Sequence, residues 1–266
     1  MNEEKITELE TAIRDKGSVI VAFSGGVDSA TIAYLAHRAL GDRAVAVTVK
    51  LHSFPDRELE HAKSVAREIG IRHRIIFFDE LKVPSIASNT AQRCYHCKKE
   101  ILHLLDDVRQ EFGFNVIMEG SNASDRNVYR PGRKAIQESS EPVYSPYLEL
   151  DITKEEIREI ARSAGLSVAG RPPSPCLASR FPYGNKLTED AIKRVELAEN
   201  FLSDLGFAEL RVRDHNGIAR IELKPFDFRD MLMHRKNIVS YFKDIGFDYV
   251  TLDLEGFRSG SMDEIL

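Results

Sequence analysis

The sequence is short of several residue types, and each shortage excludes a class of protein. It has no tryptophan and only three cysteines, Cys94, Cys97 and Cys176, among 266 residues. So small and odd a number does not predict the disulfide framework of a small secreted protein. No apolar run approaches the ~18 residues that a membrane-spanning helix needs. The amino-terminal MNEEKITELE is acidic and lacks the apolar stretch of a secretory signal, so we expect a cytoplasmic protein.

Positive charge is also in short supply. The 37 Lys and Arg residues are outnumbered by 42 Asp and Glu residues, which gives a formal net charge of −5. A surface that neutralises many phosphates needs a basic excess, so we expect no nucleic-acid partner. Hydrophobic residues make up 42% of the chain and charged residues 30%, which is typical of a globular protein. The length allows one large domain, or one domain with a smaller companion.

The first part of the chain alternates short apolar runs with helical patterns. The predicted strands are residues 18–23, 43–49, 73–78 and 114–118, and the predicted helices are 27–40, 56–69, 93–111 and 153–164. Strands that alternate with helices predict a parallel sheet covered on both faces. Thr153 followed by Glu156 is a capping box, which marks the start of the last of these helices.

A proline-rich segment, residues 170–183, then interrupts the alternation. Beyond it the pattern predicts a helix, two strands that flank the hairpin signal Asn216-Gly217, a second helix and a last strand. The corresponding ranges are 188–205, 209–214, 218–223, 227–245 and 249–254. We therefore predict an α/β parallel-sheet domain over residues 1–175. A smaller α+β domain over residues 176–266 is expected to bind substrate or to mediate oligomerisation.

A glycine-rich loop directly follows the first predicted strand and opens a helix. Unpaired N–H groups and the dipole at a helix N-terminus favour an anion, and glycine lets the backbone approach a phosphate closely. An aspartate here can hold magnesium or cap the helix. The spacing fits neither a Walker A loop nor the dinucleotide fingerprint. The predicted phosphate-binding residues are Ser24, Gly25, Gly26, Asp28 and Ser29.

A second polar segment follows the strand predicted at residues 114–118. Ligands bind at the carboxyl ends of strands in open parallel sheets. We therefore expect Gly120, Asn122, Asp125 and Arg130 on the nucleotide side of the site, although the segment is also compatible with a plain turn.

The cysteines and a pair of arginines supply further candidate sites. Cys94 and Cys97, with Cys176, could hold an iron–sulfur cluster or zinc with one position open, or they could be simple thiols. Arg211 and Arg213 alternate on one predicted strand and so share a face, where two guanidiniums suit a phosphate. A solvated strand face is the alternative for this pair.

Several stretches carry a resemblance to known families. The loop SGGVDS resembles the signature of the PP-loop ATP pyrophosphatases, which split ATP between its α- and β-phosphates. Over nearly the whole chain the sequence resembles the LarE family of PP-loop sulfurtransferases. The matching stretches are AFSGGVDSA, RCYHCKKE, GSNASDRNVYRPG, ITKEEIR, PPSPCLASRFPYG and LRVRDHNGIARIEL.

The resemblance implies an enzyme that uses ATP and magnesium to adenylate pyridinium-3,5-biscarboxylate mononucleotide. Sulfur then replaces carboxylate oxygen, giving the bisthiocarboxylate precursor of the nickel-pincer cofactor. Some family members sacrifice one cysteine, here Cys176, in a single turnover. Others bind a [4Fe–4S] cluster through three cysteines, and because this chain has all three we expect the cluster type.

The resemblance also assigns roles outside the loop and the cysteines. It places Arg180 with Arg211 and Arg213 at the substrate phosphate, and Glu196 and Glu222 near that phosphate or a metal. It further implies a sulfide donor and a homo-oligomer. Three other functions stay open: a tRNA thiolase, an ATP-dependent amide-forming ligase that needs no cysteine, and a nucleotide-sensing scaffold that releases no pyrophosphate.

Overall fold

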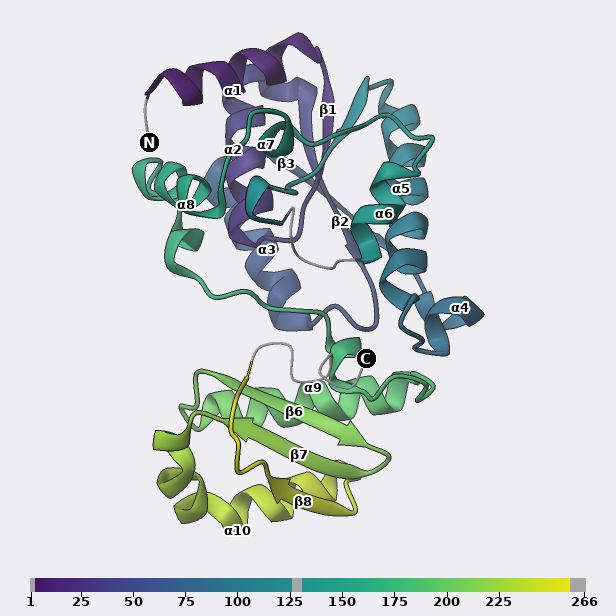
Figure 1. Ribbon diagram of the computed structural model, residues 1–266, viewed down its shortest axis with the longest axis vertical. Coiled ribbons are helices and arrows are strands. Elements are labelled where there is room, and N and C mark those ends of the chain that lie inside the picture. The colour runs from purple at the N-terminus through teal and green to yellow at the C-terminus, as the bar shows by residue number, and fades with distance from the viewer. Residues whose placement is uncertain (1–2, 126–130, 259–266) are drawn as a thin grey trace. The chain divides into compact units, whose positions relative to one another are not determined.

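The computed structural model describes residues 3–125 and 131–258 (Figure 1). The chain divides into two compact units. The first comprises residues 1–78 with 94–174, and the second comprises residues 79–93 with 175–266. Within the described ranges, every helix is too short or too polar to cross a membrane.

The first unit is built on a five-stranded parallel sheet in the order β3-β2-β1-β4-β5. Its strands are β1 Val19–Ala22, β2 Ala44–Lys50, β3 Arg72–Phe77, β4 Val116–Met118 and β5 Val143–Tyr144. The strand β1 lies at the centre, where Ile20 is paired with Val45 on one side and with Ile117 on the other. Because the chain runs outward from β1 through β2 to β3 and then returns to place β4 on the other side, the topology reverses between β1 and β4.

Helices cover both faces of this sheet (Figure 1). The helices are α1 Glu3–Asp15, α2 Val27–Leu40, α3 Asp56–Ile69, α5 Arg93–Phe112, α6 Pro131–Gln137, α7 Pro146–Glu149 and α8 Lys154–Ser163. Side chains alternate between faces along each strand. Val19 and Val21 therefore pack with α1, α2, α3, α7 and α8, whereas Ile20 and Val45 pack with Leu105 of α5.

The second unit is a three-stranded sheet in the order β6-β7-β8 with helices against it. Its elements are α4 Pro84–Ala87, α9 Glu189–Asp204, β6 Leu210–His215, β7 Ile218–Leu223, α10 Phe228–Asp244 and β8 Tyr249–Leu252. The antiparallel turn between β6 and β7 holds Asn216 and Gly217 at φ values of 55° and 92°. Both φ values are positive, as in the type I′ hairpin turn that an Asn-Gly dipeptide favours.

The predicted fold class is confirmed: a parallel α/β sheet carries the phosphate loop, and a smaller sheet follows. The capping box at Thr153 and Glu156 is also present. The sequence pattern predicted a division only near residue 175, whereas in the structure the segment 79–93 also belongs to the second unit. That segment belongs to the second unit because Leu81 packs in the second core and Asn89 donates to the Pro182 carbonyl at 2.9 Å.

Candidate functional site

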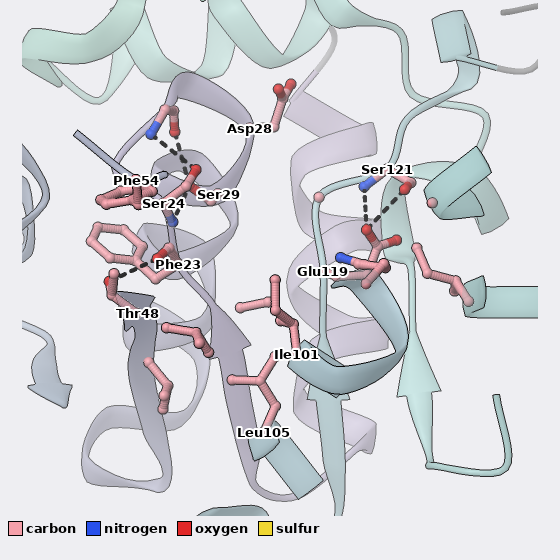
Figure 2. Close-up of a pocket in the computed structure, with 18 of the residues that line it drawn as sticks. Phe23, Ser24, Asp28, Ser29, Thr48, Phe54, Ile101, Leu105, Glu119 and Ser121 are labelled. Carbon is pink, nitrogen blue, oxygen red and sulfur yellow. Dashed lines mark hydrogen bonds between the residues drawn. The ribbon is translucent and has the colours of Figure 1, made fainter. Parts of the chain in front are cut away.

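A cavity of about 430 Å³ opens in the first unit at the point where the strand order reverses. The loops that follow β1 and β4 lie on two sides of it, and α5 supplies an apolar wall (Figure 2). The lining residues include Phe23, Ser24, Gly26, Asp28, Ser29, Thr48, Val49, Phe54, Lys98, Ile101, Leu105, Glu119, Gly120, Ser121 and Asp125. Polar groups thus meet at the strand ends, beside an apolar surface that suits a flat base.

The predicted phosphate loop forms one rim of this cavity. The Ser24 and Ser29 hydroxyls lie 3.1 Å apart, and Ser29 donates to the Gly26 carbonyl at 3.1 Å (Figure 2). Gly26 is the N-cap of α2, and no side chain caps this end of the helix. The first N–H groups of α2 therefore remain available to an anion.

The two glycines of the loop are required for different reasons. Gly25 has φ +77°, and a Cβ there would lie 2.8 Å from the Ala62 Cα on α3, so the fold itself demands glycine. Gly26 has an ordinary φ of −75°, and its Cβ would meet only the Ser24 Oγ, at 3.5 Å. Protein packing therefore does not require glycine at position 26, and because Gly26 lines the cavity, its missing side chain leaves the backbone accessible from the cavity.

Asp28 is the charged residue at the start of α2. Its carboxylate forms an ion pair with Lys154 and accepts from the Asn122 amide at 3.4 Å. The buried Tyr147 hydroxyl donates to the Asp28 carbonyl at 3.4 Å. Lys154 was not among the predicted site residues, because its only sequence signal is its place at the start of α8.

The loop after β4 packs directly against this end of α2. A Cβ on Gly120 would lie 3.0 Å from the Asp28 Cβ, so this glycine permits the close approach. Glu119 is buried and accepts from the Ser121 backbone N–H at 3.1 Å and hydroxyl at 2.8 Å (Figure 2). It also accepts from the Ser145 hydroxyl. These bonds hold the loop in place.

The predicted nucleotide-side residues are brought together here with one exception. Asp125 lines the cavity, and its carboxylate accepts from the backbone N–H of Asn122 at 3.3 Å. The carbonyl of Asp125 accepts from Arg133, a cavity residue that was not predicted. Arg130 lies outside the described residues.

Cys94 and Cys97 lie in the first turn of α5. Residues three apart on a helix share a face, and Ile101, one turn after Cys97, lines the cavity. A Cβ on the cavity residue Gly132 would lie 3.8 Å from the Cys94 carbonyl oxygen. Cys94 is exposed and Cys97 is partly exposed, and both are thiols. The two cysteines therefore lie at the beginning of the helix whose residues Lys98, Ile101 and Leu105 line the cavity.

Cys176 belongs to the second unit, where it precedes a short 3₁₀ turn, Leu177–Arg180. It is exposed, and its carbonyl accepts from the Ser179 hydroxyl at 2.8 Å. Within the same unit the buried Arg93 donates to the Ala178 carbonyl at 3.0 Å. Arg93 immediately precedes Cys94 in the chain, and Ala178 follows Cys176 by two residues.

The three predicted phosphate arginines gather in the second unit, but they differ in their partners. Arg180 is buried and holds Glu199 with two hydrogen bonds, at 2.7 and 3.0 Å. Arg213 holds the fully buried Glu222 in the same bidentate manner, at 3.0 and 2.8 Å. Both guanidiniums are thus largely neutralised by their own carboxylates.

Arg211 is the under-neutralised member of this cluster. Its guanidinium donates to the Leu210 carbonyl at 2.6 Å and lies 5.1 Å from the Phe257 ring centroid. Burial, together with the neighbouring Arg180 cation, lowers the pKa of Arg211 to about 10. A cation that burial destabilises in this way attracts an anion, because the negative charge replaces the stabilisation that water gives to an exposed cation.

The two predicted carboxylates lie in different places. Glu222, on β7, bridges Arg213 and Arg220. Glu196, on α9, is buried and pairs with Lys193 at 3.0 Å. Glu199, which sequence reasoning did not single out, contacts Arg180 directly. The sequence feature that could have identified Glu199 is its position one helical turn after Glu196 on the same helix.

Comparisons with known proteins agree with this geometry. The family model for asparagine synthase matches residues 9–94, which contain the phosphate loop. The chain is 39% identical over 98% of its length to the pyridinium-3,5-bisthiocarboxylic acid mononucleotide synthase of Lactiplantibacillus plantarum, of which it covers 95%. It is 38% identical over 100% of its length to an uncharacterized protein of Synechocystis sp., of which it covers 99%.

A more distant relative shares part of the chain. A subunit of the glutamine-hydrolyzing GMP synthase of Thermococcus kodakarensis is 30% identical over 65% of this chain and 59% of its own length. The full-length similarity to the mononucleotide synthase and the PP-loop at the strand switch point together place the chain in a family. This protein belongs to the LarE family of ATP-dependent PP-loop sulfurtransferases.

Proposed function

We propose that this protein transfers sulfur to the carboxylates of pyridinium-3,5-biscarboxylate mononucleotide after adenylating them with ATP, and so makes the bisthiocarboxylate precursor of the nickel-pincer cofactor. The observation that carries the proposal is the open, uncapped N-terminus of α2 with Gly26 at the cavity, in a chain 39% identical to the mononucleotide synthase. The adenine base is assigned to the apolar wall that Val49, Phe54 and Ile101 form.

In this proposal the residues around the loop catalyse the adenylation step. A substrate carboxylate oxygen attacks the α-phosphorus and the bond to the β-phosphate oxygen breaks, which leaves an acyl adenylate and pyrophosphate. The N–H groups at the start of α2 and the hydroxyls of Ser24 and Ser29 stabilise the charge that develops on the leaving pyrophosphate. A sulfur nucleophile then attacks the acyl carbon and displaces AMP.

Magnesium fits this site through Asp28. A magnesium ion in proteins is commonly held by one or two carboxylates plus substrate phosphate oxygens and water. Asp28 lines the cavity beside the loop, whereas the oxygens of Glu119 are occupied by Ser121 and Ser145. Bound magnesium would neutralise phosphate charge, and Lys154 would move from Asp28 toward the phosphates.

The sulfur chemistry is assigned to the three cysteines. Cys94 and Cys97 suit two ligand positions of a [4Fe–4S] cluster, because they share one face of α5 and are accessible. Cys176 is the third ligand in this proposal, and the cluster would supply a terminal sulfide that an external donor replenishes. The assignment of Cys176 as the third ligand rests on the full-length similarity of the chain to the mononucleotide synthase.

The substrate phosphate is assigned to the second unit. Arg211 attracts it, while Arg180 and Arg213 are held in position by Glu199 and Glu222. The homo-oligomer and the cytoplasmic location belong to the same proposal and rest on family membership.

The test is exchange of labelled pyrophosphate into ATP. We expect exchange only with the pyridinium biscarboxylate mononucleotide, loss of exchange in Asp28→Asn, and full exchange in Asp42→Asn, which alters an exposed aspartate beyond the other end of α2. Exchange that requires tRNA instead of the mononucleotide would overturn the proposal in favour of a tRNA thiolase. An absence of exchange with any carboxylate substrate would also overturn it.

A further inference from the structure

Phe23 is fixed to β2 at the point where the chain leaves β1 for the phosphate loop. Its N–H donates to the Val47 carbonyl at 2.9 Å, as in a regular parallel pair. Its carbonyl accepts from a side chain, the hydroxyl of Thr48, at 2.7 Å (Figure 2). Both backbone polar groups of Phe23 are therefore held in place immediately before Ser24, the first residue of the loop.

The Thr48 hydroxyl is itself oriented by His73 of the neighbouring strand β3. The Thr48 Oγ1 and the His73 Nε2 lie 2.8 Å apart, and Thr48 is buried. A hydroxyl has a single proton, and the Thr48 proton lies toward the Phe23 carbonyl oxygen, which can only accept. His73 therefore donates to Thr48 through Nε2. The His73 ring also packs edge-on against the Phe23 ring, with the ring centroids 5.3 Å apart.

The position of the Phe23 carbonyl determines where the next N–H points. The peptide between Phe23 and Ser24 is trans, and in a trans peptide the C=O and the following N–H point in opposite directions. The Ser24 N–H donates to the Ser29 Oγ at 3.2 Å, and Ser29 donates to the Gly26 carbonyl at 3.1 Å. The bond from Thr48 thus sets the direction in which the loop holds the Ser29 hydroxyl beside the cavity.

The donor on His73 is a single, defined N–H. Burial, and next the Lys63 cation, lower the pKa of His73 below its usual value, which favours the neutral ring. A neutral imidazole carries one N–H, and the geometry at Thr48 places it on Nε2. A glutamine side chain can offer an N–H at this place, whereas a leucine side chain cannot.

We propose that His73 and Thr48 are positioning residues for adenylation: together they hold the Phe23 carbonyl so that the loop presents Ser24 and Ser29 to the departing pyrophosphate. The inference rests on the proposed function, because it requires pyrophosphate on the loop. His73 lies on the edge strand of the sheet and acts only through Thr48 and Phe23.

Single and double variants test this role in the full chain purified without oxygen. Thr48→Val keeps the side-chain shape but loses the hydroxyl. His73→Leu loses the donor, whereas His73→Gln keeps an N–H at the place of Nε2. His234→Leu alters an exposed histidine of the second unit and is the matched control. Calorimetry measures binding of inorganic pyrophosphate and, separately, of AMP.

We expect His73→Leu and Thr48→Val each to bind pyrophosphate about 3- to 10-fold more weakly, which is the range that one net hydrogen bond contributes. Because His73 acts through Thr48, the double variant Thr48→Val/His73→Leu should bind pyrophosphate no more weakly than Thr48→Val alone. AMP binding by His73→Leu should be unchanged, and His73→Gln should recover most of the pyrophosphate affinity.

Unchanged pyrophosphate binding in either single variant would overturn the inference. Additive losses in the double variant would also overturn it, because they would show that His73 acts independently of Thr48. Equal losses for AMP and pyrophosphate in His73→Leu, with no recovery in His73→Gln, would indicate a structural role alone and overturn it as well. If the unaltered protein binds no pyrophosphate, the proposed function itself fails.

Discussion

The two glycines of the phosphate loop make opposite predictions for the same substitution. Gly25→Ala places a side chain at φ +77° and sets its Cβ 2.8 Å from a backbone atom of Ala62. The left-handed conformation costs an L-residue about 1–2 kcal/mol, and overpacking costs about 1–3 kcal/mol. We therefore expect Gly25→Ala to lower the free energy of unfolding by about 2–5 kcal/mol.

Gly26→Ala should leave the fold almost unchanged. Its φ is −75°, and the added Cβ meets only the Ser24 Oγ at 3.5 Å, so the effect on unfolding should stay within about 1 kcal/mol. The methyl group enters the space assigned to pyrophosphate, so pyrophosphate affinity should fall at least about tenfold, or ~1.4 kcal/mol.

Urea unfolding and calorimetric titration with pyrophosphate separate the two effects. The reasoning predicts an unstable Gly25→Ala and a stable Gly26→Ala that binds poorly. A Gly25→Ala protein as stable as the unaltered one would refute the steric argument. A Gly26→Ala protein with normal pyrophosphate affinity would refute the assignment of the anion to this loop.

Three further predictions come from other parts of the molecule. Arg211→Gln should abolish the rise in melting temperature that inorganic phosphate is expected to cause, because it removes the under-neutralised cation of its cluster; an equal rise in both proteins would contradict the assignment. Glu222→Ala should cost about 3–5 kcal/mol in urea unfolding, because it leaves the buried Arg213 without its carboxylate, and a cost below about 1 kcal/mol would show that the pair is not structural. The hydrogen bonds from Lys5 and Thr153 lower the pKa of Glu156 to about 2, so their stabilisation is complete above the usual carboxyl pKa and is lost as the pH falls toward 2. Glu156→Gln should therefore lose less stability than the unaltered protein between pH 5 and pH 2, as acid-unfolding curves would show, and identical curves would count against this pair.

Local patterns were sufficient to predict most elements of the fold. The helices α2 and α3 begin and end at the predicted residues, because glycine stands just outside one end of each and the apolar spacing is regular. The fifth strand, β5, was not predicted, because two residues carry no alternation to detect. Helix α1 was also missed, although Leu9 and Ile13 lie one turn apart and are fully buried.

Partners far apart in sequence account for what the sequence could not show at the site. Lys154 reaches Asp28 across 126 residues, and no local pattern marks such a pair. Ala62 of α3 packs against Gly25, and no local pattern in either segment predicts that contact. The segment 79–93 joins the second unit through Leu81, which packs in the second core, and through Asn89, which donates to the Pro182 carbonyl, and the pattern of its own segment reveals neither contact. The phosphate loop, in contrast, was predictable because all of its residues are contiguous.

The central claim is repeated ATP-dependent sulfur insertion with the help of Cys94, Cys97 and Cys176. The most direct measurement incubates protein purified without oxygen with ATP, magnesium, sulfide and the pyridinium biscarboxylate mononucleotide, and follows both product and protein by mass spectrometry. The account predicts protein-bound iron and acid-labile sulfide, more than one thiocarboxylate formed per chain, an unchanged chain mass, and loss of all turnover in Cys176→Ala. A chain that loses hydrogen sulfide from Cys176 after one turnover would contradict the cluster route, and an ATP-consuming protein that forms no thiocarboxylate would contradict sulfur transfer itself.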